Sequence, residues 1–370
     1  MINAKRLCDL FQELVSIDSP SFGEREMNHF LKSRLASLGI PAQEDDAGGK
    51  MSGDSGNLYA YIPGDIDLPP LLFCGHMDTV EPSRGKRAVV DRNGTITSAG
   101  NTVLGADDCA ALASFLEALT VLHEGKIPHR PIELLLTAAE EPYCTGVRYA
   151  DFDKIQAKEA YVFDLDGPVG RAALQAPTIL SWRLHFTGRS AHAGFAPEEG
   201  IHAVKAAAAA IDNIPCGHVG EATVNVGTIT GGTATNIVPE QCILTGEIRS
   251  FSNQEAQALL ADIEVAAGEA AATYGATVQV DHTVHVSAYY TPADHPATRR
   301  FQAACRQMQL EPELGKTFGG SDNNILSEHG IIGLVVATAM NNCHSCAEYT
   351  TAKELERAAN LALALMLSKE

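Results

Sequence analysis

Several hydrophobic segments of this chain end in acidic or histidine residues, and this pattern restricts both its fold and its chemistry. Buried strands rarely end in such groups, because desolvating them costs several kcal/mol unless something pairs with them. A cluster of carboxylates without nearby Lys or Arg requires cations, and two histidines among them favour zinc-like over magnesium-like ions. The sequence therefore predicts a two-metal hydrolase. The segments are LLFCGHMDT (71–79), GADDC (105–109), LLLTAAEEP (134–142), AYVFDLD (160–166) and NNCHSC (341–346).

The same apolar runs predict an α/β fold. Continuous runs such as IELLLTAA, AYVF and IIGLVVATAM are typical of parallel strands that are covered on both faces. They alternate with segments in which apolar residues recur at helical spacing, and this alternation predicts a sheet flanked by helices. The Gly/Asp/Ser-rich stretch 44–56 is predicted to be a surface loop. The predicted helices span 2–17, 24–38, 105–125, 293–308 and 351–368.

The middle of the chain has a different pattern. Strands such as SWRLHF and TVNVGTI alternate apolar and polar residues, which indicates that one face is exposed. Predicted helices over 197–212 and 253–273 separate four such strands in the order of a split βαβ unit. We therefore predict a smaller ferredoxin-like α+β domain over 178–290, inserted into a catalytic α/β domain formed by 1–177 and 291–370.

Length and charge narrow the possible partners. A chain of 370 residues is long for one core, and its net charge of −19 argues against nucleic acid or anionic membranes as partners. No apolar run is long enough to span a bilayer, and polar residues interrupt the first 18 residues, unlike in a signal peptide. Nine scattered cysteines suit a reducing compartment better than a disulfide framework. We expect a cytoplasmic protein.

The strand-end residues can meet although they lie far apart in the sequence. In an open α/β sheet the carboxyl ends of the parallel strands lie at one edge, where ligands collect. Asp107, at the start of a predicted helix, has two oxygens and can bridge two ions. The ligands that we predict are His76, Asp107 and Asp164 for one ion, and Asp107, Glu141 and His344 for the other.

Two carboxylates near the predicted ligands are expected to support catalysis without binding a metal ion. Asp78 lies two residues after His76, on the same face of an extended segment, where it can orient the imidazole. Glu140 can take a proton from a water shared by the ions and pass it to a leaving amine, which contributes about 10²–10⁴-fold to the rate. An isolated Glu140–Glu141 pair is more often a solvated pair, but the apolar run before it indicates a buried strand.

Two alternatives arise beside the predicted ligands. The spacing of FDLDGPVG does not exclude Asp166 as the ligand, although we prefer Asp164 because it directly ends the run AYVF. Cys343 and Cys346 flank His344 as in a zinc knuckle, but no second cysteine pair lies nearby. We therefore treat these two cysteines as incidental.

The motifs resemble those of the co-catalytic zinc peptidases, which include peptidase T, aminoacylase, carboxypeptidase G and succinyl-diaminopimelate desuccinylase. GHMDTV, GADDCAA, TAAEEPYCTG and NNCHS carry the resemblance, which covers nearly the whole chain. It implies the same ligands and base as above, and a cis peptide bond between Asp107 and Asp108. DGPVG and HAG look closer to the peptidase T branch than to the deacylases.

Further motifs resemble segments of the family that bind substrate. GRSAHAG implies that His192 reaches the site of a neighbouring subunit and stabilises the oxyanion, so a homodimer through the inserted lid domain is expected. TATNIVPE and GEIRS imply that Asn236 and Arg249 hold a terminal carboxylate. FGGSDNN implies a loop that binds the substrate backbone through Gly319, Gly320 and Ser321, with Asp322 in the same motif.

The function predicted from these residues is a metal-dependent exopeptidase, aminopeptidase-like or tripeptidase-like, that acts on short peptides through a hydroxide bridging two ions. Zinc is the preferred metal, although cobalt or manganese also fit the ligand set. One alternative is an N-acyl-amino-acid deacylase or carboxypeptidase that uses the same catalytic residues. A metal-binding scaffold without activity is a third hypothesis, against which the presence of Glu140 argues.

Overall fold

The structure is a computed structural model that describes residues 1–369, and the chain packs as two compact units. The larger unit comprises Met1–Gln175, Tyr290–Thr317 and the chain from Ser321 onward. The smaller unit comprises Ala176–Tyr289 and Phe318–Gly320. The sequence predicts one domain formed by 1–177 and 291–370 and a second formed by 178–290. These limits of independently folding domains remain predictions. Glu370, the end of the last predicted range, lies outside the described residues.

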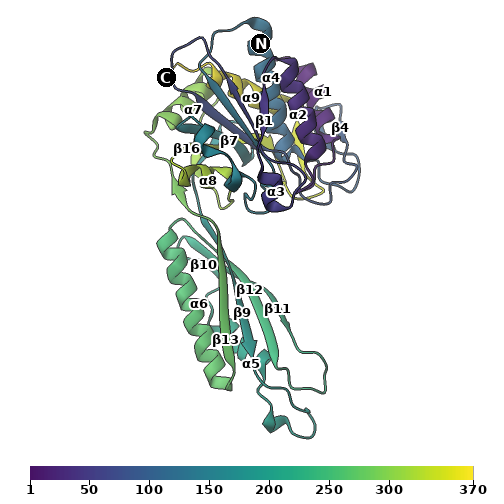
Figure 1. Cartoon of the computed structure of the whole chain (residues 1–370), viewed down its shortest axis with the longest axis vertical. Coiled ribbons are helices and arrows are strands. Elements are labelled where there is room, and N and C mark those ends of the chain that lie inside the picture. The colour runs from purple at the N-terminus through teal and green to yellow at the C-terminus, as the bar shows by residue number, and fades with distance from the viewer. Residues whose placement is uncertain (370) are drawn as a thin grey trace. The chain divides into compact units, whose positions relative to one another are not determined.

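The larger unit is built on a nine-stranded sheet (Figure 1). Eight strands follow the order β1-β2-β6-β3-β7-β16-β8-β14, and β15 pairs with β8. The strands are β1 (Ala42–Glu44), β2 (Leu58–Ile62), β3 (Leu71–His76), β6 (Ile132–Thr137), β7 (Glu159–Asp166), β8 (Arg171–Ala176), β14 (Tyr289–Tyr290), β15 (Glu313–Lys316) and β16 (Ile332–Met340).

The four central strands are parallel. β3 pairs in parallel with β6 and β7, and β16 pairs in parallel with β7. Every residue of β3 and β6 is buried, which matches the continuous apolar runs of their sequences. The predicted α/β fold with a parallel sheet is therefore confirmed, and the carboxyl ends of these strands lie at one edge.

Helix α4 (Ala106–Gly125) lies at the centre of the packing on one face of this sheet. It contacts β3, β7 and β16 as well as α1 (Ala4–Val15) and α9 (Ala352–Met366). Phe115 of α4 packs edge-on against Phe73 and Phe163 at centroid distances of 5.9 and 4.9 Å. The remaining helices of this unit are α2 (Arg25–Ser37), α3 (Ala47–Met51), α7 (Pro296–Gln307) and α8 (Asp322–Glu328).

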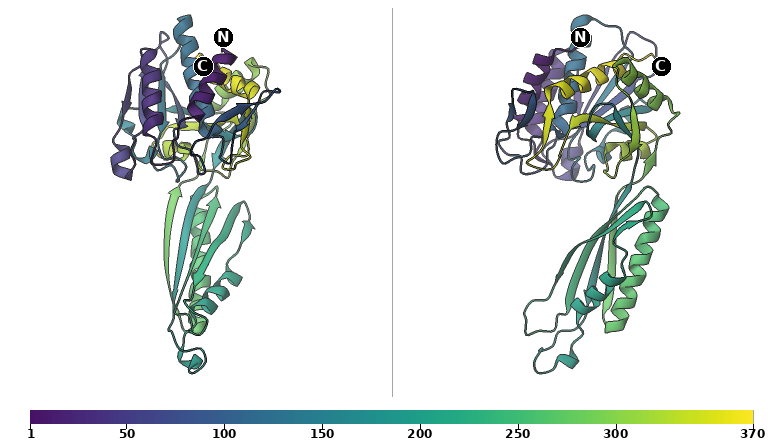
Figure 2. Two further views of the ribbon diagram at one scale, coloured as in Figure 1. Left: turned by 90° about the vertical axis from the view of Figure 1, so that its right-hand side faces the viewer. Right: turned by 180° about the vertical axis from the view of Figure 1, so that it is seen from behind.

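The other face of the sheet meets α8. Side chains alternate across a strand, so Cys74 points to the face opposite Phe73. The Cys74 thiol lies 3.6 Å from Asp322 at the start of α8, and α8 contacts β7 and β16. Figures 1 and 2 show helices on both sides of the sheet in this unit. Layers of this kind are expected for a mainly parallel sheet.

Two local predictions were wrong. The stretch 44–56 contains the helix α3, because Asp45 Oδ1 accepts hydrogen bonds from the backbone N–H groups of Ala47 (3.0 Å) and Asn57 (2.9 Å). This long-range anchor orders a segment whose composition is typical of a loop. The helix predicted over 197–212 begins at Ala203, because Pro197–Glu199 forms a separate 3₁₀ turn.

The larger unit also contains a three-stranded sheet. The sheet has the order β17 (Tyr349–Thr351), β5 (Thr95–Ser98), β4 (Ala88–Val90), and the hairpin β4–β5 forms two of its strands. The turn between β4 and β5 is closed by the N–H of Asp91, which donates to Thr95 O at 2.9 Å, and Gly94 adopts a φ of +83° there. Among residues 1–369, no helix combines the length and apolar character needed to cross a bilayer.

The smaller unit has the ferredoxin-like topology that the sequence predicts. Its antiparallel sheet has the order β10-β11-β12-β9-β13, and the chain runs β9, α5, β11, β12, α6, β13 apart from the short edge strand β10. The elements are β9 (Thr178–Thr187), α5 (Ala203–Asn213), β10 (Gly217–Val219), β11 (Ala222–Gly231), β12 (Gln241–Ser250), α6 (Asn253–Tyr274) and β13 (Thr277–Val286).

Alternation along the strands separates the core of the smaller unit from its exposed face. Leu180, Trp182, Leu184 and Phe186 of β9 are all buried, and they share a core with α5 and α6. Both helices contact β12 and β9, so they cover the face to which these side chains point (Figure 2). The intervening residues of β9 point to the other face, as expected for a sheet that is covered on one side only.

Gly246 should be required for this core. A Cβ atom at Gly246 would lie 2.0 Å from Trp182 Cζ2 and 2.1 Å from Asn225 O. Gly246→Ala is expected to lower the free energy of unfolding of the smaller unit by about 1–3 kcal/mol or more. Trp182 is the only tryptophan of the chain, so its fluorescence during urea unfolding reports this unit specifically.

Gly268 provides the matched control. It is exposed within α6 and a Cβ there would meet nothing within 4 Å. Gly268→Ala should raise the free energy of unfolding by about 0.5–1 kcal/mol, because alanine favours the helix. Equal unfolding midpoints for Gly246→Ala and the wild-type protein would contradict the close packing of Trp182 on β12.

Candidate active site

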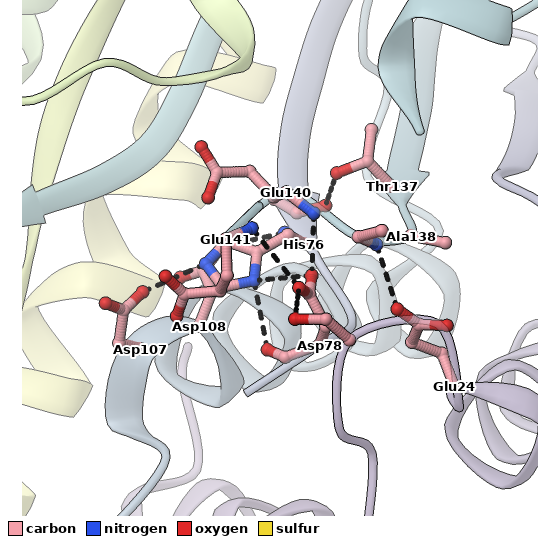
Figure 3. A network of polar contacts seen from close by, with 12 residues as sticks. Glu24, His76, Asp78, Asp107, Asp108, Thr137, Ala138, Glu140 and Glu141 are labelled. Carbon is pink, nitrogen blue, oxygen red and sulfur yellow. Dashed lines mark hydrogen bonds and ion pairs between the residues drawn. The ribbon is translucent and has the colours of Figure 1, made fainter. Parts of the chain in front are cut away.

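The strand-end residues meet at the carboxyl edge of the large sheet, and Figure 3 shows four of them, His76, Asp107, Glu140 and Glu141. His76 is the last residue of β3, and Asp107 lies in the first turn of α4. Glu140 and Glu141 lie in the loop that follows β6, and Asp164 lies near the end of β7. His344 follows β16 in a loop, so segments far apart in the sequence supply one cluster.

Asp107 lies between the two histidines. His76 Nε2 lies 2.9 Å from Asp107 Oδ1, and His344 Nε2 lies 3.2 Å from Asp107 Oδ2. His344 Nε2 also lies 2.9 Å from Glu141 Oε2. Each oxygen of Asp107 therefore faces a different imidazole, which is the arrangement required of a carboxylate that bridges two ions.

The remaining predicted ligand, Asp164, lies in the same cluster. One ligand atom each from His76, Glu140 and Asp164 lies within 4.8 Å of the others, as do ligand atoms from His76, Asp107 and Glu141. The pairing of β7 with β16 shifts register between Val162 and Leu165, and irregularities of this kind redirect side chains near functional sites.

Asp166 lies on the same strand but is exposed. It belongs to none of the groups of potential ligands that the described residues form. This geometry favours Asp164 over Asp166 as the ligand, although the identity of the ligand stays a prediction.

The electrostatics of the cluster fit divalent cations. Burial raises the pKa of Asp164, and the charge of Asp107 adds to this effect. Hydrogen bonds to Asp107 and Glu141 raise the pKa of His344 to about 10. Although burial opposes it, hydrogen bonds to His344 and His76 lower the pKa of Asp107. Cations would replace the imidazole protons and offset the repulsion among the carboxylates.

Atomic spacing supports the same conclusion. Two ligand atoms that bind the same zinc-like ion, each about 2.1 Å from it, lie about 3.0–3.4 Å from each other. The distances from His76 to Asp107 and from His344 to Asp107 and Glu141 are 2.9–3.2 Å. Glu141 Oε1 is buried and has no hydrogen-bond partner within residues 1–369, so one more oxygen is available to a cation.

Asp78 connects the first histidine to the loop after β6. Its backbone carbonyl accepts from His76 Nδ1 at 3.0 Å, and its Oδ1 lies 3.3 Å from the same nitrogen. The backbone N–H groups of Glu140 and Glu141 donate to the Asp78 carboxylate at 3.0 and 3.2 Å, and Ser21 Oγ donates at 2.7 Å. Asp78 therefore positions a ligand and the acidic pair together.

Glu140 is buried at the edge of the cluster. Burial, with the charge of Asp164, raises its pKa well above that of an ordinary glutamate. A carboxyl group whose pKa is raised in this way binds a proton more strongly than an ordinary glutamate does. The Cys144 thiol lies 3.3 Å from Glu140 Oε1 and is the proton donor of that contact.

Sequence reasoning missed two buried glutamates that support this geometry. Glu348 accepts the backbone N–H of Gly105 at 2.7 Å and that of Asp107 at 3.0 Å. Glu24 accepts the N–H of Ala139 at 2.9 Å. Burial raises the pKa of each to about 7. Glu348 directly precedes a strand, a position that could have identified it, whereas nothing in the sequence around Glu24 indicates its contact.

The peptide bond between Asp107 and Asp108 is cis, so the expectation from the family resemblance is confirmed. Asp108 is buried, and its Oδ2 accepts the backbone N–H of His76 at 3.1 Å. The two aspartates thus have different environments. Asp107 faces the imidazoles, whereas Asp108 binds the backbone of β3.

His192 belongs to the smaller unit, where its side chain is exposed. Its Nδ1 accepts the backbone N–H groups of Gly194 and Phe195, each at 3.1 Å, and the ring stacks on Phe195. Since Nδ1 is an acceptor, the proton of the neutral ring is on Nε2. In this tautomer Nε2 is a hydrogen-bond donor, as an oxyanion requires.

The other residues predicted to bind substrate are divided between the units. Arg249 forms a bidentate ion pair with Glu247, at 2.6 and 3.2 Å, and donates to Phe318 O at 2.6 Å. Asn236 is exposed in the smaller unit, to which Gly319 and Gly320 also belong. Ser321 is buried in the larger unit, at the N-cap of α8.

Models of known protein families match most of the chain. A model of the M20 peptidase dimerisation domain matches residues 176–275, which lie in the smaller unit. A model of peptidase family M28 matches residues 57–174, which contain His76, Asp107, Glu140, Glu141 and Asp164.

Solved structures and a curated relative match nearly the full length. An aminopeptidase PepT from Bacillus cereus is 35% identical with a TM-score of 0.93, and 99% of this chain aligns with 98% of that one. A tripeptidase from Staphylococcus aureus is 31% identical with a TM-score of 0.96 and the same coverage. The uncharacterised protein YqjE of Bacillus subtilis is 35% identical over 367 residues, 99% of each chain.

Glu348 should control metal affinity without touching an ion. Glu348→Ala removes the acceptor for the N–H of Asp107, so the bridging carboxylate loses its anchor, and affinity for divalent metal should fall about 10–100-fold. Competition with a chromophoric chelator measures this. Glu328→Ala, an exposed change in α8, is the control. Unchanged affinity in a folded Glu348→Ala protein would show that Asp107 needs no such anchor.

Proposed function

Because this chain belongs to the M20 family of metallopeptidases, we propose that it is a two-metal exopeptidase that hydrolyses short peptides from one end. The observation that carries the proposal is the position of Asp107 between His76 and His344, with Glu140 beside them. The relatives described as aminopeptidase and tripeptidase support short peptides as substrates. We propose tripeptides as the first candidates.

We propose that His76, Asp107 and Asp164 hold one ion, and that Asp107, Glu141 and His344 hold the second. When bound, such ions polarise a carbonyl and lower the pKa of a water molecule. Zinc is our preferred metal, because the two histidines favour it over magnesium, although cobalt and manganese also suit the ligands.

Glu140 is the proposed acid–base group. It takes one proton from the attacking water and delivers it to the nitrogen of the scissile amide, so that the products are a carboxylate and an amine. The raised pKa of Glu140 supports this role, because burial favours the protonated form after the first transfer. Asp78 keeps Glu140 in position through the backbone N–H of that residue.

For the substrate, we propose that Arg249 and Asn236 hold a terminal carboxylate and that Gly319, Gly320 and Ser321 contact its backbone. The guanidinium of Arg249 already binds a carboxylate, that of Glu247, in a bidentate manner, which supports this chemistry. The same interaction suits an N-acyl amino acid or a C-terminal residue. A deacylase or carboxypeptidase is therefore the second candidate.

We further propose a homodimer in which His192 completes the site of the other subunit. The match of residues 176–275 to a dimerisation domain supports the dimer. The exposed position of His192 and the proton on its Nε2 support a role as donor to the developing oxyanion. We also propose a cytoplasmic location, which the nine free cysteines support.

The first test replaces the base. Glu140→Gln keeps the size of the side chain but cannot accept a proton, so kcat should fall about 10²–10⁴-fold. Metal content, measured by mass spectrometry of the dialysed protein, should stay unchanged. Retention of most activity by Glu140→Gln would exclude Glu140 as the base, and loss of metal would make it a ligand.

Mixing two variants tests the exchange of His192 between subunits. Glu140→Gln and His192→Ala should each be nearly inactive alone. After subunit exchange, mixed dimers contain one site with an intact base and an intact partner histidine, so about a quarter of the wild-type activity should return. Glu140→Gln mixed with itself is the control. No recovery after verified exchange would mean that His192 acts within its own chain or not at all.

A substrate panel separates the two candidate functions. We expect the metal-loaded protein to cleave free tripeptides with a kcat/KM at least about 10-fold above that for N-acyl amino acids, a difference of about 1.4 kcal/mol. Mass spectrometry of the products identifies the end that is cleaved. Preference for N-blocked amino acids would establish the deacylase instead.

A further inference from the structure

A third group of potential metal ligands lies beside the proposed base. Ligand atoms from Glu140, Cys144 and Asp322 lie within 4.8 Å of one another, and all three residues are buried. None of them is among the ligands proposed for the two catalytic ions. Glu140 is the proposed acid–base group beside those ions and also a member of this third group. The group therefore needs its own explanation.

The geometry of the thiol suits a cation as well as a proton. Cys144 Sγ lies 3.3 Å from Glu140 Oε1, and the backbone N–H of Cys144 donates to Glu140 O at 2.5 Å. An ion held by sulfur at about 2.3 Å and by a carboxylate oxygen at about 2.1 Å, at a tetrahedral angle, separates them by about 3.6 Å. A shift of a few tenths of an ångström would thus let one ion replace the thiol proton.

Asp322 supplies the third ligand. Its Oδ2 accepts from Thr137 Oγ1 at 2.6 Å and lies 3.6 Å from Cys74 Sγ. Its Oδ1 is buried and has no hydrogen-bond partner in residues 1–369. Leaving such an oxygen without a partner is costly, and a cation would satisfy it.

We propose that Glu140, Cys144 and Asp322 form a third cation site, selective for thiophilic divalent ions such as Zn²⁺ or Cd²⁺, whose occupation inhibits the enzyme. Binding releases the thiol proton to solvent and leaves a thiolate, which soft ions prefer and Mg²⁺ or Ca²⁺ do not. The ion also takes the oxygen of Glu140 that would otherwise receive the proton of water. Excess metal would therefore inhibit the enzyme by blocking Glu140 and not by displacing the catalytic ions. The inhibition rests on the proposed peptidase function, but the binding does not.

The two types of site can be distinguished by spectroscopy. The ligands proposed for the catalytic ions are nitrogen and oxygen only, so a thiolate-to-metal charge-transfer absorption in the ultraviolet reports the third site. Cd²⁺ is titrated into the metal-loaded full-length protein while absorption and peptidase activity are recorded. Mg²⁺ at the same concentrations is the parallel titration. Cys144→Ser, which keeps a hydroxyl donor to Glu140 but loses the thiolate, is compared with Cys216→Ser, the same change at an exposed cysteine.

We expect the wild-type protein and Cys216→Ser to gain the absorption and to lose activity over the same Cd²⁺ range. Cys144→Ser should gain no absorption, and its half-inhibitory Cd²⁺ concentration should be about 10–100-fold higher. Absence of the absorption from the wild-type protein, or its persistence in Cys144→Ser, would overturn the proposal. Inhibition by Mg²⁺ equal to that by Cd²⁺ would also overturn it.

Two further outcomes keep the inferences separate. If Cys144→Ser fails to fold by circular dichroism, Cys144→Ala replaces it, and the wild-type titration still tests the site. A protein that gains the absorption but hydrolyses no peptide would support the third site and reject the peptidase. A peptidase whose absorption never changes would reject the third site alone.

Discussion

Repulsion among buried carboxylates is the constraint on which the organisation of this chain depends. Asp107, Glu141 and Asp164 converge at one edge of the sheet, where His76 and His344 contact the carboxylates. Such a group is stable only if protons or metal ions offset its charge. The pKa shifts describe the first solution, because burial raises the pKa of Asp164, and nearby carboxylates raise that of His344. During catalysis, metal ions would offset the charge in place of protons.

The fold supplies what this charge cluster needs. Four parallel strands bring their carboxyl ends to one edge, and α4 packs on β3 and β7 beside it. Two other carboxylates, those of Asp78 and Glu348, accept hydrogen bonds from backbone N–H groups and are not proposed as metal ligands. Asp78 holds the N–H groups after β6, and Glu348 holds that of Asp107. Positions of the proposed ligands thus depend on hydrogen bonds that are themselves buried, and changes at these supporting residues should affect metal affinity.

Sequence patterns predicted the parts of this arrangement that depend on local periodicity. His76 and Asp164 were recognisable because each ends an apolar run, and the topology of the smaller unit followed from alternation in its strands. Glu24 and the helix α3 could not be predicted, because each depends on a contact with a backbone group or side chain remote in the sequence. The role proposed for His192 came from a family resemblance, since an exposed histidine carries no signal of its own.

The measurement that tests this account most directly is anomalous X-ray diffraction from crystals of the zinc-loaded protein at the zinc absorption edge. We expect two peaks about 3.5–4 Å apart, with Asp107 between them. One peak should contact His76 and Asp164, and the other Glu141 and His344. A single peak, or two peaks that do not share Asp107, would contradict the two-metal site.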